Sequence, residues 1–189
     1  MSAAFHQVEI ELLRSLVGQL LELVRGQPAT RDSQPSDDPL AAALGFGDVP
    51  SRPTDPVVLR LFPDGYREDD EAAAEFRRFT ERSLREAKAG SAATMLASLE
   101  AVSLDSAKED VSKREKIRLR LDQAQAQGWL RTLTDLRLAL GTRLGVEEGD
   151  DERWAALADD DPRRHIHDVY EWLGWVQETL VRALSARLP

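Results

Sequence analysis

The sequence of 189 residues predicts a mostly α-helical fold, a single-domain helical bundle with at most one short strand. Three observations predict it. Long segments repeat apolar residues every three or four positions, which is the period of amphipathic helices. Aspartate, proline and glycine stand where these segments begin or end. Hydrophobic residues make up 42% of the chain and charged residues 31%, so residues 1–189 can bury one sizeable core.

The first helix is predicted over residues 5–26, FHQVEIELLRSLVGQLLELVRG. Its inner stripe consists of apolar residues at helical spacing: Phe5, Leu12, Leu16, Leu20 and Leu23. Gly26 and Pro28 end this helix. The polar, proline-rich segment 27–38 is expected to form a mobile loop.

Three Asp-Pro pairs mark helix starts, at Asp38-Pro39, Asp55-Pro56 and Asp161-Pro162. Aspartate caps the first free amides, and proline fits the first helical position because its missing N–H had no partner there. The segment that follows Asp55, PVVLRLF, is also rich in β-branched residues, so a short strand is the alternative to the preferred helix. The pair at Asp161 opens the last helix, predicted over 162–187.

The second long helix is predicted over residues 67–90, with an acidic first turn that suits the helix dipole. Its narrow inner face is predicted to contain two aromatic and two small residues: Phe76, Phe79, Ser83 and Ala87. Gly90 and Ser91 are expected to end or kink it before a helical pattern resumes. Residues 103–115 carry no periodicity and are expected to form a loop.

The segment KIRLRLD, residues 116–122, alternates apolar and basic residues and predicts the one short strand. Asp122 followed by Gln125 resembles a capping box, so a helix is predicted from there to Gly145. An acidic loop around a short helical turn, 147–161, then leads to the last helix.

Charge and composition limit the function classes. The net charge of −9 repels nucleic acid and anionic membranes, so only a local basic patch could bind either. The absence of cysteine excludes disulfides, thiolate metal sites and cysteine nucleophiles from these residues. The first residues, MSAAFHQVEIELL, lack the basic head and apolar run of a secretory signal, and no apolar run approaches the ~20 residues that span a bilayer. We therefore expect a cytoplasmic protein.

Three helices each place one polar residue on their apolar face: Glu9, Arg137 and Gln177. A lone buried charge is costly, so these residues predict a shared, structural network in which Glu9 pairs with Arg137 and Gln177 takes a remaining donor. Glu75 and Glu171 are the reserve carboxylates. The alternative is that these side chains reach outward to water, and a further hypothesis is a ligand site built on Arg137.

Trp175 falls on the polar arc of the last helix, about 60° from Trp172 in helical projection. An exposed aromatic patch is typical of a partner surface, so Trp172 and Trp175 are the predicted interaction residues. The alternative is that a neighbouring element covers them.

Five arginines are candidates for a phosphate-binding patch: Arg78, Arg82, Arg85, Arg118 and Arg120. Glutamates are interleaved with the first three at helical spacing, which favours a solvated, salt-bridged face. His165 and His167 stand two residues apart, a spacing that cannot place both on one metal from a helix. No phosphate loop, dinucleotide fingerprint or nucleophile elbow occurs, so we expect no metal, no cofactor and no catalytic residues.

Four segments in order, VEIELLRSLVGQLLEL, DPVVLRLFPDGYREDDEAAAEFRRFTE, WLRTLTDLRLALGTRL and VYEWLGWVQETLV, resemble an actinobacterial family, the domain of unknown function family two thousand seventeen. The resemblance implies a helical architecture and a gene neighbourhood beside the Clp-protease adaptor, and some members are called transcriptional regulators. Members carry a basic, glycine-containing segment before the first helix. If that segment pairs as a strand with KIRLRL, either this chain lacks the partner or its native start site lies upstream of Met1.

The preferred function is therefore a non-enzymatic protein-interaction or regulatory module whose partner is another protein or a second copy of the chain. The resemblance links it to Clp proteolysis. The first alternative is a nucleic-acid-binding transcriptional regulator that uses the second helix and the basic segment. The second alternative is a ligand-binding domain or enzyme built around Arg137.

Overall fold

The computed structural model of the chain describes residues 1–26, 53–108 and 116–186, with the side chains of 103–108 left aside. The described residues form six helices and one two-stranded sheet, so the prediction of a mostly helical fold is confirmed. The loop predicted at 27–38 and the helix predicted after Asp38-Pro39 lie outside the described residues.

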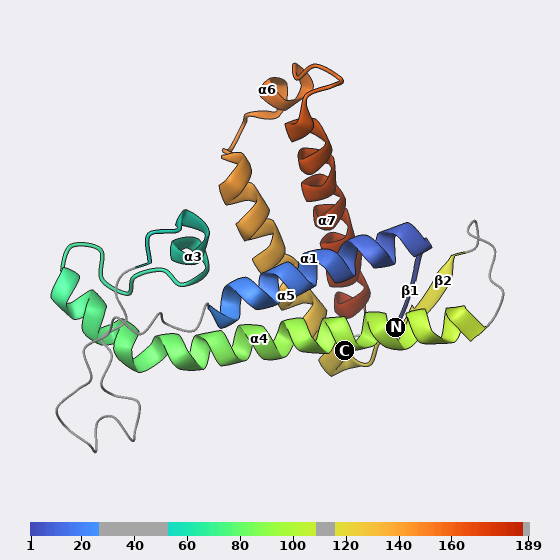
Figure 1. The fold of residues 1–189 in the computed structure, drawn as a ribbon, viewed down its shortest axis with the longest axis horizontal. Helices are drawn as coiled ribbons and strands as arrows, with labels where there is room; N and C mark the ends of the chain where they lie inside the picture. The colour runs from blue at the N-terminus through green and yellow to red at the C-terminus, as the bar shows by residue number, and fades with distance from the viewer. Residues whose placement is uncertain (27–52, 109–115, 187–189) are drawn as a thin grey trace.

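Helix α4 (Asp70–Lys108) runs along the long axis of the described structure, and α1 (Gln7–Arg25) packs against it (Figure 1). Helix α5 (Gln123–Leu144) contacts α4 and then extends away from it. Helix α7 (Pro162–Ser185) runs back beside α5, so that the two form an antiparallel hairpin. Two short helices complete this part of the chain. The first, α3 (Pro56–Leu61), packs against α5, and the second, α6 (Asp151–Ala155), lies at the tip of the hairpin.

The capping residues act as predicted. Asp122 Oδ1 accepts a hydrogen bond from the Gln125 amide at 2.8 Å, and Gln125 Oε1 accepts one from the Asp122 amide at 2.9 Å. The helix ends at Gly145, whose left-handed backbone (φ 65°) favours glycine. Asp55 and Asp161 cap α3 and α7, so the segment after Asp55 is a helix and not the alternative strand.

Strand β2 (Ile117–Arg120) is present where the alternation predicts it, and it pairs antiparallel with β1 (Ser2–Phe5). The expectation that this chain lacks a partner for the strand was wrong, as was the expectation that a helix begins at Phe5. Phe5 is apolar and buried, so it fits either period, and its pairing with Ile117 decides in favour of the strand. Helix α1 starts only after His6, whose amide donates to Glu9 Oε2 at 2.6 Å.

Helix α4 runs without a break through Gly90 and Ser91 and includes residues 103–108, so the predicted end or kink and part of the predicted loop were wrong. Residues 109–115 of that loop lie outside the described residues. A glycine inside a helix costs only about 1 kcal/mol relative to alanine. The buried Ala92 and Met95 just beyond Gly90 pack into the core and offset that cost.

The predicted inner face of α4 was also wrong, because Phe76 and Phe79 are 41% and 61% exposed. The first turns of α4 instead bury Arg77 and Glu81. Both charges are paired within the fold, Arg77 with Asp64 and Glu81 with Arg85, and the small apolar Ala73 is buried in the same part of the helix.

The core lies where α1, α4 and α5 meet, and it continues beneath the sheet to α7. Trp129 is the largest fully buried side chain, and its indole Nε1 donates to Ser98 Oγ at 2.8 Å. None of the helices in the described ranges has the length and apolar character needed to cross a bilayer.

Candidate functional site

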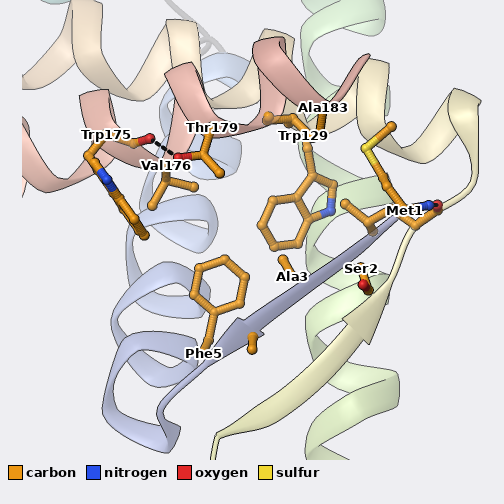
Figure 2. A pocket seen from close by; sticks show the side chains of 12 residues that line it. Met1, Ser2, Ala3, Phe5, Trp129, Trp175, Val176, Thr179 and Ala183 are labelled. Atoms are coloured by element: carbon orange, nitrogen blue, oxygen red, sulfur yellow. Dashed lines mark hydrogen bonds between the residues drawn. The ribbon is translucent and has the colours of Figure 1, made fainter. Parts of the chain in front are cut away.

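An apolar cavity of about 240 Å³ lies between β1 and α7 (Figure 2). One wall is the whole of β1, and the opposite wall is a face of α7. The side chains that shape it are mainly apolar: Met1, Ala3, Phe5, Trp129, Val176 and Leu180. The size suits one or two apolar side chains of a bound molecule.

The floor of the cavity is held in place from the core side. The rings of Phe5 and Trp129 stack with centroids 6.0 Å apart and planes at 26°. Trp129 is fixed in turn by its hydrogen bond to Ser98 on α4. On the α7 wall, the Thr179 hydroxyl donates to the Trp175 carbonyl at 2.8 Å (Figure 2). Phe5, Trp129 and Thr179 are therefore already held by partners within the fold.

Trp175 lines this cavity and is 62% exposed. Trp172, three residues earlier, is half-buried and packs against the core. The two tryptophans predicted to form one patch thus have different environments, and Trp175 alone supplies the exposed indole. A large apolar side chain held in water beside an apolar cavity is typical of a surface that binds a partner.

Arg137 lies between α5 and α7 and is held by neutral groups. Its Nη1 donates to Gln177 Oε1 at 3.1 Å and its Nη2 to Tyr170 Oη at 3.3 Å. The guanidinium carbon also lies 4.9 Å from the centre of the Tyr170 ring. Gly174 leaves room for it, since a Cβ there would come within 3.3 Å of the guanidinium. The predicted contact between Arg137 and Gln177 therefore exists and joins two helices.

The predicted ion pair between Glu9 and Arg137 is not formed. Glu9 instead accepts the His6 amide at the start of α1, and the reserves Glu75 and Glu171 are exposed. The wheel projection of α1 put Glu9 on the apolar arc, but the first turn of a helix has free amides that attract a carboxylate. That local partner is much nearer than a side chain on another helix.

A buried ion pair that sequence reasoning missed joins α4 to α5. Lys88 Nζ lies 2.6 Å from Asp135 Oδ1, and Asp135 is only 5% exposed. A second group lies at the start of α4, where Arg77 pairs with Asp64 and Glu81 with Arg85. The four-residue spacings of this group were visible in the sequence, but their burial depends on α1 and the loop after α3.

The five arginines of the predicted basic patch do not form one surface. Arg118 and Arg120 are exposed on β2, near the C-terminal end of α4, whereas the other three lie near its start (Figure 1). Arg82 pairs with Glu86 at 3.1 Å, and Arg85 pairs with Glu81 and donates to the Val24 carbonyl at 2.6 Å. The predicted salt-bridged face therefore exists, although Arg85 and Glu81 are partly or fully buried in it.

The histidines of the last helix also differ. His165 is exposed, whereas His167 stacks on Trp154 of α6 with ring centroids 4.4 Å apart and planes at 11°. Within the part of the chain that the structure describes, no group of three or more histidines and carboxylates is placed to hold a metal ion.

The model of the family described as Domain of unknown function (DUF2017) matches residues 1–184. The chain belongs to this family. The matched range includes β1 and the whole cavity-lining part of α7, so the cavity is formed within the DUF2017 domain.

The chain is similar to mycobacterial members of known name, which supports an actinobacterial family. It is 34% identical over 193 residues to the putative oxidative stress regulator AosR of Mycobacterium leprae, covering 94% of this chain and 79% of that protein. It is 32% identical over 190 residues to the oxidative stress regulators AosR of Mycobacterium bovis and Mycobacterium tuberculosis, covering 93% of this chain and 78% of theirs. The comparison with solved structures found no match.

Proposed function

We propose that this chain is a regulator that acts by binding another protein at the surface formed by Trp175 and the cavity between β1 and α7. The observation that carries the proposal is the indole of Trp175, which is 62% exposed beside a preformed apolar cavity. The relatives named oxidative stress regulators support the regulatory part of the proposal.

The chemistry of the cavity favours binding over catalysis. None of the described lining residues carries a charged side chain, and the hydroxyl of Thr179 is already used within α7. A nucleophile or general acid needs an activating partner, and an apolar wall supplies none. An apolar side chain of a protein partner fits the same wall without any such group.

The absence of cysteine shapes the regulatory mechanism. Sensors of oxidants commonly use exposed cysteine thiolates. This chain contains no cysteine in its 189 residues, so these residues hold no thiol switch. The proposed role is therefore a contact with a partner protein, through which a signal sensed elsewhere acts.

The alternative of a nucleic-acid-binding regulator stays a prediction, and two features weigh against it. The net charge is −9, and the five arginines of the predicted basic patch are divided between the first part of α4 and strand β2 near its other end. The link to Clp proteolysis, which the family resemblance implies, also stays a prediction about who the partner is.

A transcript experiment in the organism that encodes this chain tests the proposal. The gene is deleted and restored as wild type, as Trp175→Ser or as Val181→Ser, and transcripts are compared after hydrogen peroxide. Val181 is the matched control, because it lies on α7, is 41% exposed and does not line the cavity. Wild type and Val181→Ser should restore the response at equal protein level, and Trp175→Ser should not. Unchanged transcripts in the deletion strain would refute the regulatory role, and full restoration by Trp175→Ser would refute the surface.

A further inference from the structure

The backbone of β1 has one edge that no described strand covers. Within the described residues the sheet contains β1 and β2 alone, and all five residues from Met1 to Phe5 line the cavity on the side of α7. Successive side chains of a strand point to opposite faces of the sheet. A cavity that is lined by residues of both faces therefore runs along the edge of the strand. The apolar cavity therefore lies along the free edge of β1.

The pairing pattern identifies which backbone groups that edge presents. The N-terminal ammonium of Met1 donates to the Leu121 carbonyl at 2.7 Å, and the Leu121 amide donates to the Met1 carbonyl at 2.8 Å. Bonded and non-bonded pairs alternate along an antiparallel ladder, so Ala3 and Phe5 also bond towards β2. The amides and carbonyls of Ser2 and Ala4 consequently point along the free edge, at the spacing that an added strand requires.

The outer face of the sheet is positively charged. Arg120 stands opposite Ser2 and Arg118 opposite Ala4, and all four residues are exposed. Neither arginine has an ion pair with a described residue. A strand added beside β1 would place its outward side chains about two strand spacings, roughly 10 Å, from these arginines. The small side chains of Ser2 and Ala4 leave the way open, and a long arginine side chain can cross that distance to a carboxylate.

We propose that the partner's binding segment is an extended peptide that adds as a third strand to the free edge of β1, with apolar side chains turned into the cavity beside Trp175 and acidic side chains turned outward towards Arg118 and Arg120. This inference rests on the proposed function and names the class of partner. Backbone bonds to Ser2 and Ala4 supply the register, the cavity accepts one or two apolar side chains at alternate positions, and the arginines select the charge beside them. The positive strip is local, since the whole chain carries a net charge of −9.

A synthetic peptide with alternating residues, Glu-Val-Glu-Ile-Glu-Val-Glu, is the probe, and fluorescence anisotropy measures its binding to the full chain. It should bind at least tenfold more tightly than the same peptide with lysine in place of glutamate, and added salt should reduce the difference. A peptide N-methylated at the amides on one edge should lose binding, since it cannot pair with β1. Equal binding of the glutamate and lysine peptides, or of the N-methylated peptide, would overturn the proposal.

Two changes to the protein test the same contact from the other side. Ala4→Pro removes the outward amide but leaves the β1–β2 bonds intact, and it should weaken the glutamate peptide about fivefold or more, which corresponds to one lost backbone hydrogen bond. The double change Arg118→Glu with Arg120→Glu should reverse the preference to the lysine peptide. Its matched control is Arg78→Glu with Arg82→Glu, which makes the same change of net charge at the other end of α4 and should leave the preference as it was.

The outcomes separate this proposal from the proposed function. If Trp175→Ser abolishes the transcript response but Ala4→Pro and the arginine reversal leave it intact, strand addition is overturned and the regulatory surface stands. If all three variants abolish the response and the peptide binds as described, both stand. Self-association in sedimentation that Ala4→Pro abolishes would assign the free edge to a second copy and overturn the acidic partner.

Discussion

The buried ion pair between Lys88 and Asp135 leads to the sharpest stability prediction. The carboxylate of Asp135 is on the buried side of α5, and the ammonium of Lys88, 2.6 Å away, is its one ion-pair partner among the described residues. The Lys88 side chain is 23% exposed and that of Asp135 is 7% exposed. Lys88→Met keeps the aliphatic stem but leaves a negative charge enclosed between α4 and α5.

The expected loss of stability follows from the different exposure of the two side chains. Removing one partner of a buried pair costs about 3–5 kcal/mol, because the remaining charge has lost both water and its counter-ion. Lys88 reaches the surface, so water can approach part of the way and we expect the lower end, about 3 kcal/mol, for Lys88→Met. Replacing both residues, Lys88→Met with Asp135→Leu, removes the charge altogether and should cost about 1 kcal/mol or less.

Urea unfolding of the wild type, Lys88→Met, Asp135→Leu and the double variant is followed by far-ultraviolet circular dichroism. The four free energies of unfolding form a double-mutant cycle that gives the coupling between the two side chains directly. The matched control is Arg82→Met, which breaks the exposed pair with Glu86 and should cost about 0.5 kcal/mol or less. A Lys88→Met cost below about 1 kcal/mol, or strictly additive single changes, would refute the argument from burial.

Three further predictions concern α7 and its contacts. Arg137→Met should cost only about 1–2 kcal/mol, because Arg137 is half-buried and its hydrogen bonds to Gln177 and Tyr170 and its contact with the Tyr170 ring all join neutral groups. A cost of about 3–5 kcal/mol in urea unfolding would instead indicate a buried counter-ion. Trp175→Ser should change the free energy of unfolding by about 0.5 kcal/mol or less because the indole is 62% exposed, and a large loss of stability would place Trp175 in the core instead. The pKa of Asp161 is lowered from 3.8 to about 2, first by the hydrogen bond from the Arg163 side chain and then by the one from its amide. The folded pKa lies below the unfolded one, so this cap contributes its full stability above pH 3.8 and loses it between pH 3.8 and about 2. A carboxyl-carbon NMR titration should find that lowered pKa, and a midpoint near 3.8 would contradict the cap geometry.

Some of the candidate site was visible in the sequence. The helical projection of 162–187 turned Trp175 away from the leucines, and the structure leaves it exposed. The cavity beside it was not visible, because its walls come from residues 1–5 and 175–183, which no local pattern relates. The contact between Arg137 and Gln177 was predicted from two polar residues on two apolar faces, but the choice of Glu9 as a third member required knowledge of which helices meet.

The starts of three helices and the end of one could be predicted from local sequence alone. Three helices are capped by an aspartate whose carboxylate accepts a hydrogen bond from an amide two or three residues later: Asp55, Asp122 and Asp161. Helix α5 ends at Gly145 because glycine readily adopts the left-handed backbone conformation found there. Interactions of this range are settled within one turn and need no other element. Other features depend on contacts between distant parts of the chain: Phe5 belongs to a strand, Phe76 and Phe79 face water, and Asp135 pairs with Lys88. In each of these cases the local sequence pattern is compatible with two arrangements. The observed one is stabilised by a contact with residues far away along the chain, which local patterns do not reveal.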